Sequence, residues 1–179
     1  MSTEDDNFKE KSAFLFDVIK RYDHYIATTN FKVALMMSFI AAIVLGLTIR
    51  IMSIKPSGDW FYYISLVSSG LTIILSLVAA LNLFKAVFPN TSTHDGKKSL
   101  IFFDDVANSD NGTDGYMEKL ENATQKSIFE DLSKQTFIMA EIVKEKFRIL
   151  KIAVNIIIIG VIPTLIISLF FLILFAANH

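Results

Sequence analysis

The stretch IAVNIIIIGVIPTLIISLFFLILFAAN occupies residues 152–178 and contains no charged residue. A helix needs about 20 apolar residues to cross the hydrocarbon core of a bilayer, so this stretch is long enough to span one. Two further uncharged runs occupy Val33–Ile49 and Trp60–Phe84. The first of these is short, but Lys32 and Arg50 at its ends can lift their charges to the membrane surface and extend the usable span. The sequence therefore predicts three membrane-spanning helices.

The composition favours a membrane protein over a soluble one. Of the 179 residues, 53% are hydrophobic, which is high for a soluble domain. A buried helix of a soluble bundle seldom stays uncharged for more than about 14 residues, and a β-barrel needs alternating segments of about 10 residues, a pattern that these runs lack. We expect an all-α membrane protein that assembles as a homo-oligomer.

Basic residues predict the orientation, because Lys and Arg collect on the cytoplasmic side of a membrane. Those before the first span are Lys9, Lys11, Lys20, Arg21 and Lys32, and only Arg50 and Lys55 lie between the first two spans. Those flanking the segment between the second and third spans are Lys85, Lys97, Lys98, Lys144, Lys146, Arg148 and Lys151. We expect a cytoplasmic amino terminus, an external carboxyl terminus and no removable signal peptide, because the start MSTEDD is acidic.

The pattern divides the chain into four segments. They are an amphipathic cytoplasmic or interfacial helix at 1–30, a transmembrane hairpin at 31–88 with spans at about 32–52 and 60–85, a cytoplasmic sensor region at 89–150 with a helix at about 116–150, and the third span at 151–179. The first helix either continues into the first span or lies along the membrane surface before turning in.

The cytoplasmic region contains two further signals. No Pro or Gly follows Tyr116 before the third span, so we expect one continuous helix over about 116–176, with a kink at Pro163. The apolar pentad Ser99–Phe103 stands alone in a polar linker, and we expect a short strand or helix docked on the neighbouring helices.

Catalytic patterns are missing from the sequence. It has no cysteine, three dispersed histidines and no glycine-rich phosphate loop, so we expect neither an enzyme nor a cofactor or metal site. Asp104 and Asp105 could bind a divalent ion, but a solvated turn is the better interpretation because no third ligand lies nearby. The net charge of −1 argues against bulk attraction to nucleic acid.

The second span carries small and hydroxylated residues along one face. They are Ser65, Ser68, Ser69, Thr72 and Ser76. Such residues either pack helices closely or line an aqueous path in an oligomer, and we favour packing for any single residue. Asn82 and Asn155 are the strongly polar side chains well inside the runs, and we expect hydrogen bonds between helices or subunits, or a gate.

Basic and aromatic residues also occur together in the sensor region. The candidate ligand-binding residues are Lys97, Lys98, Phe102, Phe103, Gln135, Lys146 and Arg148. Basic residues at a cytoplasmic boundary are most simply explained by topology and anionic lipid. The alternative is a pocket for a phosphorylated, stackable ligand such as a nucleotide.

Three stretches together resemble the Pycsar-type transmembrane effector family of bacterial antiphage systems. They are RYDHYIATTNFK at 21–32, SLIFFDDVA at 99–107, and Asp131-Leu132 with Gln135, Ala140 and Lys146-Phe147 before the third span. The positions that match the family pattern are Asn30, Lys32, Phe102, Phe103, Gln135 and Lys146. No separate cyclic-nucleotide-binding fold is recognisable, which leaves room for a longer oligonucleotide bound by several subunits.

The resemblance implies a multi-pass effector in the bacterial inner membrane. It is paired with a nucleotidyltransferase or cyclase encoded nearby, whose nucleotide product controls it, and it permeabilises the membrane and arrests growth. We expect an oligomeric ion channel or pore, with a tetramer as the working guess. The alternative is a non-conducting scaffold that recruits a cytoplasmic partner through residues 89–150.

Overall fold

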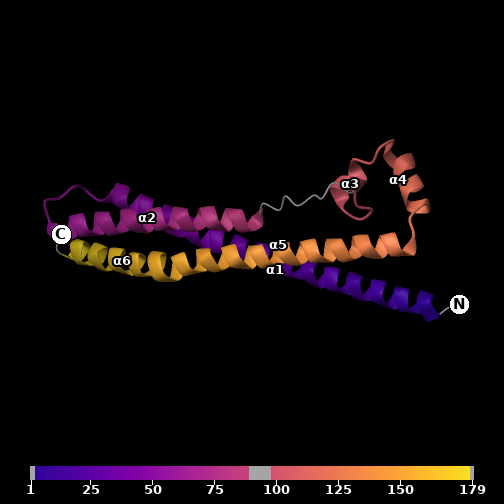
Figure 1. Ribbon diagram of the computed structural model, residues 1–179. Helices are drawn as coiled ribbons and strands as arrows, with labels where there is room; N and C mark the ends of the chain where they lie inside the picture. Colours follow the sequence, from indigo (N-terminus) through magenta and orange to yellow (C-terminus); the bar gives the residue numbers. More distant parts are fainter. Residues whose placement is uncertain (1–2, 89–97, 178–179) are drawn as a thin grey trace. The chain divides into compact units, whose positions relative to one another are not determined.

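The computed structural model describes residues 3–88 and 98–177, with side chains from Asp6 onward, and within these residues it contains helices and no strand. The helices are α1 (Thr3–Ser53), α2 (Trp60–Val87), α3 (Phe103–Ala107), α4 (Gly112–Glu121), α5 (Gln125–Ile156), the π-helix η1 (Ile157–Val161) and α6 (Ile162–Ala177) (Figure 1). Three helical stretches are long and apolar enough to cross a membrane: α1, α2 and the run from α5 to α6. The predicted all-α fold is confirmed for the described residues, and the three predicted spans fall on the three helices that could cross a membrane.

The chain forms two compact units. The polar unit comprises Met1–Ala27 and Asn90–Lys144, and the apolar unit comprises Thr28–Pro89 and Glu145–His179. Helices α1 and α5 each contribute residues to both units. The unbroken course of α1 confirms that the amphipathic segment continues into the first span as one helix.

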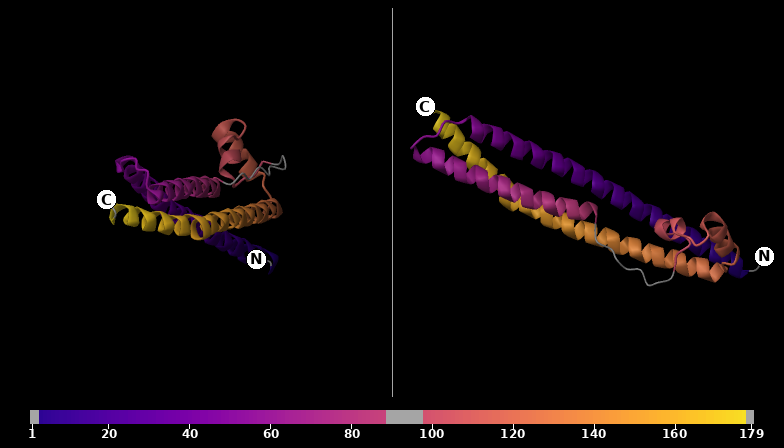
Figure 2. Two further views of the ribbon diagram at one scale, coloured as in Figure 1. Left: turned by 90° about the vertical axis from the view of Figure 1, so that its left-hand side faces the viewer. Right: turned by 90° about the horizontal axis from the view of Figure 1, so that it is seen from above.

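Small residues set the packing of α2 in the apolar unit. Seven of the eight buried residues of this helix, all except Ser68, recur at alternating intervals of four and three: Ser65, Ser69, Thr72, Ser76, Ala79, Leu83 and Ala86. This spacing forms one continuous seam along a helix. In the views of Figures 1 and 2, α2 runs alongside α6, and the hydroxyls of Ser69 and Ser168 form a hydrogen bond across the interface. Small side chains of this kind let transmembrane helices approach closely.

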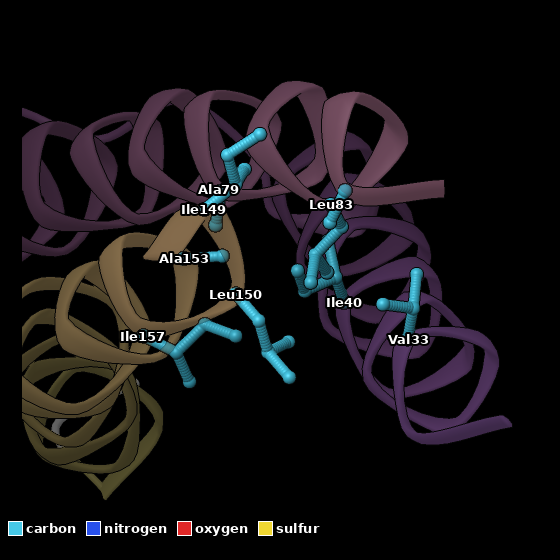
Figure 3. Packing of buried hydrophobic residues seen from close by; sticks show 9 residues of the cluster. Val33, Ile40, Ala79, Leu83, Ile149, Leu150, Ala153 and Ile157 are labelled. Carbon is cyan, nitrogen blue, oxygen red and sulfur yellow. The ribbon is translucent and has the colours of Figure 1, made fainter. Parts of the chain in front are cut away.

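A hydrophobic cluster joins three helices of the apolar unit. Figure 3 shows Val33 and Ile40 of α1 and Leu83 of α2 grouped near the residues of α5. The α5 residues of the cluster are Ile149, Leu150 and Ala153, and Ile157 of η1 extends it. Ala79 of α2 and Ala153 of α5 are completely buried, so neither position has room for a larger side chain.

The π-helix precedes the proline of the third span. Pro163 cannot donate a backbone hydrogen bond, and its ring crowds the carbonyl four residues earlier. The wider turn of η1 makes room for the proline ring. In this turn the N–H of Ile162 bonds to the carbonyl of Ile157, five residues earlier. The hydroxyl of Thr164 donates to the Gly160 carbonyl at 2.8 Å. A Cβ at Gly160 would lie 3.2 Å from Leu75 Cδ1, so glycine allows η1 to approach α2.

The prediction of one helix from Tyr116 onward is wrong at its beginning. Helix α4 ends at Glu121 and α5 begins at Gln125. The side chain of Asn122 donates to the Glu118 carbonyl at 2.9 Å, and the Thr124 hydroxyl accepts from the N–H of Ser127 at 3.1 Å. Asn and Thr compete with the helical backbone in this way, and both types favour helix ends.

The close packing around Ala79 predicts the effect of a larger side chain. Ala79→Leu should lower the free energy of unfolding by about 1–3 kcal/mol, because the added atoms force α2 away from its neighbours. Ala42→Leu adds the same atoms at an exposed position of α1 and is the control. Unfolding in mixed micelles, followed by circular dichroism, measures both. Equal stability of the two variants would contradict this account of the interface.

Candidate functional site

Ser99 organises the loop that precedes α3 in the polar unit. Its hydroxyl donates to Asp131 Oδ2 at 3.0 Å and accepts from the N–H groups of Ile101 and Phe102 at 3.1 and 3.0 Å. The N–H of Ser99 donates to Asp105 Oδ2 at 2.9 Å. The Ser99 side chain therefore stabilises a turn in the backbone at residues 99–102.

Helix α5 holds this loop through two side chains one turn apart. Asp131 Oδ2 accepts from the N–H of Leu100 at 2.8 Å, and Gln135 Nε2 donates to the Ser99 hydroxyl at 3.1 Å. From α4, the Tyr116 hydroxyl donates to the Leu100 carbonyl at 3.0 Å. The apolar pentad Ser99–Phe103 is therefore docked on α5, as predicted. The prediction that it forms a strand or helix is wrong for Ser99 to Phe102, because α3 begins only at Phe103.

A cavity of about 330 Å³ lies beside the Ser99 loop. Its lining residues are Lys98, Ser99, Leu100, Asp105, Ser127, Glu130, Asp131, Lys134, Gln135 and Ile138. Three carboxylates and two ammonium groups line it, so it lacks the positive surplus expected of a phosphate site.

Lys98, which lines this cavity, is paired with an acid. Its ammonium lies 2.9 Å from both carboxylate oxygens of Asp110, and Lys119 lies 3.5 Å from Asp110 Oδ2. The hydrogen bond and charge of Lys98, followed by the charge of Lys119, lower the pKa of Asp110. These pairs connect the loop to the turn before α4. Gly115, within α4, is required because a Cβ there would meet the Asp110 carbonyl at 1.8 Å.

The two predicted aromatic residues lie next to each other. The ring centroids of Phe102 and Phe103 are 4.9 Å apart, and Phe103 is 76% exposed at the start of α3. Asp104 accepts from the Asn108 side chain at 3.0 Å, while Asp105 binds the N–H of Ser99. Within the described residues, no group of three acidic or histidine side chains could hold a metal ion.

Lys146 is buried in the apolar unit, where it caps α2. Its side chain is 3% exposed, and its ammonium donates to the carbonyls of Ala86 and Val87, both at 2.8 Å, and to Asn30 Oδ1 at 3.0 Å. The two carbonyls belong to the last turn of α2, where the helix dipole is negative and favours a cation. Because all three ammonium protons are bonded, Lys146 ties α1, α2 and α5 together and has a structural role in this state.

The predicted ligand residues are thus divided between the two units. Lys98, Phe102, Phe103 and Gln135 belong to the polar unit, and Lys146 and Arg148 belong to the apolar unit. Arg148 forms a two-point ion pair with Glu145 at 2.6 and 2.7 Å. Lys97 lies outside the described residues.

The hydroxylated face of α2 packs inside the chain. Ser65, Ser68, Ser69, Thr72 and Ser76 are all buried. Within a single chain these residues therefore lie in a packed helix interface. Of the two amides, Asn82 is half-buried and donates to the Val78 carbonyl at 2.9 Å. Asn155 is exposed, and its side-chain amide has no hydrogen-bond partner among the described residues.

Comparison with known proteins identifies the family. The sequence model of the Pycsar effector protein domain, PycTM, matches residues 14–175. The chain belongs to the Pycsar effector family. It is 29% identical over 162 residues to the Pycsar effector protein EcPycTM of Escherichia coli, an alignment that covers 82% of this chain and 83% of that relative. No solved structure matches.

Membership of the Pycsar effector family confirms the resemblance and implies an antiphage membrane effector. Several of the positions that carried the resemblance have defined contacts. Asn30 and Lys146 bond to each other, Gln135 bonds to Ser99, and Lys32 is exposed. Asp131 and Ser99, which connect the loop to α5, lie in the stretches that carried the resemblance. They were not selected as candidate ligand residues, because a lone Asp on a helix gives no sign of its partner.

Lys146 provides a test of its capping role. Lys146→Met keeps a similar volume but leaves three buried oxygens without their donor, so we expect the free energy of unfolding to fall by about 2–3 kcal/mol. Lys151→Met, at an exposed position of the same helix, is the matched control and should change little. Unfolding in mixed micelles measures both. A Lys146→Met variant as stable as the wild type would exclude the capping role.

Asp131 provides a test of the docked loop. Asp131→Ala removes the acceptor of the Leu100 N–H and the Ser99 hydroxyl, so amide hydrogen exchange at residues 99–102 should accelerate at least about tenfold. Glu130→Ala alters a neighbouring carboxylate that lines the same cavity, and it should leave these amides unchanged. Exchange measured by mass spectrometry would refute the docking if both variants behaved alike.

Proposed function

We propose that this Pycsar effector assembles into an ion channel or pore that a nucleotide or oligonucleotide signal controls through the polar unit. The observation that carries the proposal is the course of two helices. Helices α1 and α5 each begin in the polar unit, which contains the cavities, and continue into the apolar unit, which contains the helices long enough to cross a membrane. A ligand that binds two states of the polar unit with different affinity shifts the balance between them. Permeabilisation of the membrane and growth arrest of the infected cell follow.

The positive-inside pattern supports an orientation in the bacterial inner membrane. The amino terminus and the polar unit lie in the cytoplasm and the carboxyl terminus lies outside. A cognate nucleotidyltransferase or cyclase encoded nearby supplies the signal. The effector is not an enzyme and responds by a change of conformation.

Assembly of several copies is part of the proposal, with a tetramer as the working number. The serine and threonine hydroxyls of α2 are buried inside one chain, so a polar path through the membrane needs other residues. Asn155 supports this, because an exposed amide within an apolar run is stabilised by a second subunit or by water. Since an amide both donates and accepts, identical copies of Asn155 can bond to one another.

Planar-bilayer recording of the purified protein tests conduction. We expect current that depends on added 3′,5′-cyclic mononucleotides or short oligoribonucleotides. Asn155→Leu should lower the single-channel conductance severalfold, because an apolar ring disfavours water in the path. Asn82→Leu is the matched control, since the Asn82 amide is already bonded within its helix. Absence of current with and without nucleotides would instead support a scaffold that recruits a partner.

A further inference from the structure

A second kind of cavity lies in the polar unit, between the starts of α1 and α5. It measures about 390 Å³, within the range of small-molecule sites. Its lining residues are Asn7, Phe8 and Lys11 of α1, and Gln125, Lys126 and Phe129 of α5. We call this site the α1–α5 cleft.

The side chains of the α1–α5 cleft differ in chemistry from those of the Ser99 cavity. Two ammonium groups, two phenyl rings and two carboxamides line the cleft, and no carboxylate does. Three carboxylates line the Ser99 cavity. The nearest acid to Lys126 is Glu130, 3.8 Å away in a solvent-exposed pair, which is worth little. The cleft therefore has a surplus of positive charge.

The two rings form an aromatic wall in this cleft. Phe8 and Phe129 are half-buried, with centroids 6.1 Å apart and planes inclined by 58°. A planar heterocycle stacks on such a ring face. The neighbouring amides of Asn7 and Gln125 both donate and accept hydrogen bonds, as the polar edge of a nucleobase requires.

The start of α5 adds to the attraction for an anion. Gln125 and Lys126 are the first two residues of this 32-residue helix, so the positive end of its dipole lies at the cleft. Lys11 contributes a second ammonium from α1. Together they suit one phosphate group beside one aromatic base.

We propose that the α1–α5 cleft binds a mononucleotide, with the base on the Phe8–Phe129 wall and the phosphate at Lys11 and Lys126. This inference rests on the proposed nucleotide control and assigns it to a site distinct from the Ser99 loop. Because α1 and α5 both continue into the apolar unit, a ligand held by both helices acts on the two elements that enter the membrane.

Equilibrium binding to the full chain in phosphatidylcholine nanodiscs tests the cleft. The probes are the four common 3′,5′-cyclic mononucleotides and the corresponding 5′-monophosphates. We expect at least one of them to bind, and Phe8→Leu and Phe129→Leu should each raise its Kd about tenfold through loss of stacking. Lys11→Gln and Lys126→Gln should raise it by a similar factor. The controls are Phe14→Leu and Lys9→Gln, at exposed positions of α1 outside the cleft.

The outcomes separate this site from the proposed function. Binding that is unchanged in all four cleft variants overturns the cleft while nucleotide control stands. A wild-type chain that binds none of the probes overturns the mononucleotide cleft, while control by an oligonucleotide, the other signal in the proposed function, stands. If the lysine variants lose affinity for phosphatidylglycerol vesicles but keep their Kd for nucleotides, the cleft is a membrane contact and the proposal is wrong.

Discussion

The ammonium of Lys146 is the constraint on which the apolar unit depends most. An ammonium removed from water loses several kcal/mol of hydration, and it remains charged only if its protons are well bonded. Here three oxygens take the three protons, and two of them are the terminal carbonyls of α2, which would otherwise lack partners. The same hydrogen bonds thus stabilise the buried ammonium of Lys146 and satisfy the last carbonyls of α2. It also joins α2 to α1 through Asn30, so a change at this point alters three helices together.

The packing of α2 explains why one chain by itself offers no polar route through a membrane. The hydroxyls of Ser65, Ser68, Ser69 and Thr72 are bonded to their own helix or to Ser168, and Ser76 is buried without a hydrogen-bond partner among the described residues. Large apolar side chains face outward. Exposed Val67, Ile74 and Leu81 recur every seven residues along that outer face. Such a face suits lipid. Any conducting path therefore depends on the interface between copies of the chain. Of the three long apolar helices, the one that ends in α6 has an exposed amide, Asn155, and a π-helical turn at Gly160. These features suit a pore-lining helix that changes conformation.

The sequence predicted those features that follow from uncharged length and from unbroken helical periodicity. The three spans and the long α1 were predicted because each depends on residues that are near neighbours in the chain. The gap between α4 and α5 was missed, although Asn122 and Thr124 are residue types that end and begin helices. Lys146 was selected as a ligand residue because a basic side chain near a membrane boundary gives no sign of burial. Its carbonyl partners lie some 60 residues away in sequence, and only the fold brings them to it.

The Ser99 cavity and the α1–α5 cleft, both in the polar unit, differ in ways that argue for different roles. Around Ser99, the side chains of Asp105, Asp131 and Gln135 bond to the loop, and acids outnumber the bases in the cavity, so the loop is stabilised without a ligand. At the α1–α5 cleft, the positive groups outnumber the negative ones, and the aromatic wall lies beside polar side chains. A group of like charges at one place opposes folding, so an anion that enters the cleft stabilises the arrangement of α1 and α5 that receives it. A docked loop that supports α5 and a cleft that senses an anion are complementary parts of a switch, because a ligand shifts an equilibrium only where its affinity differs between the two states.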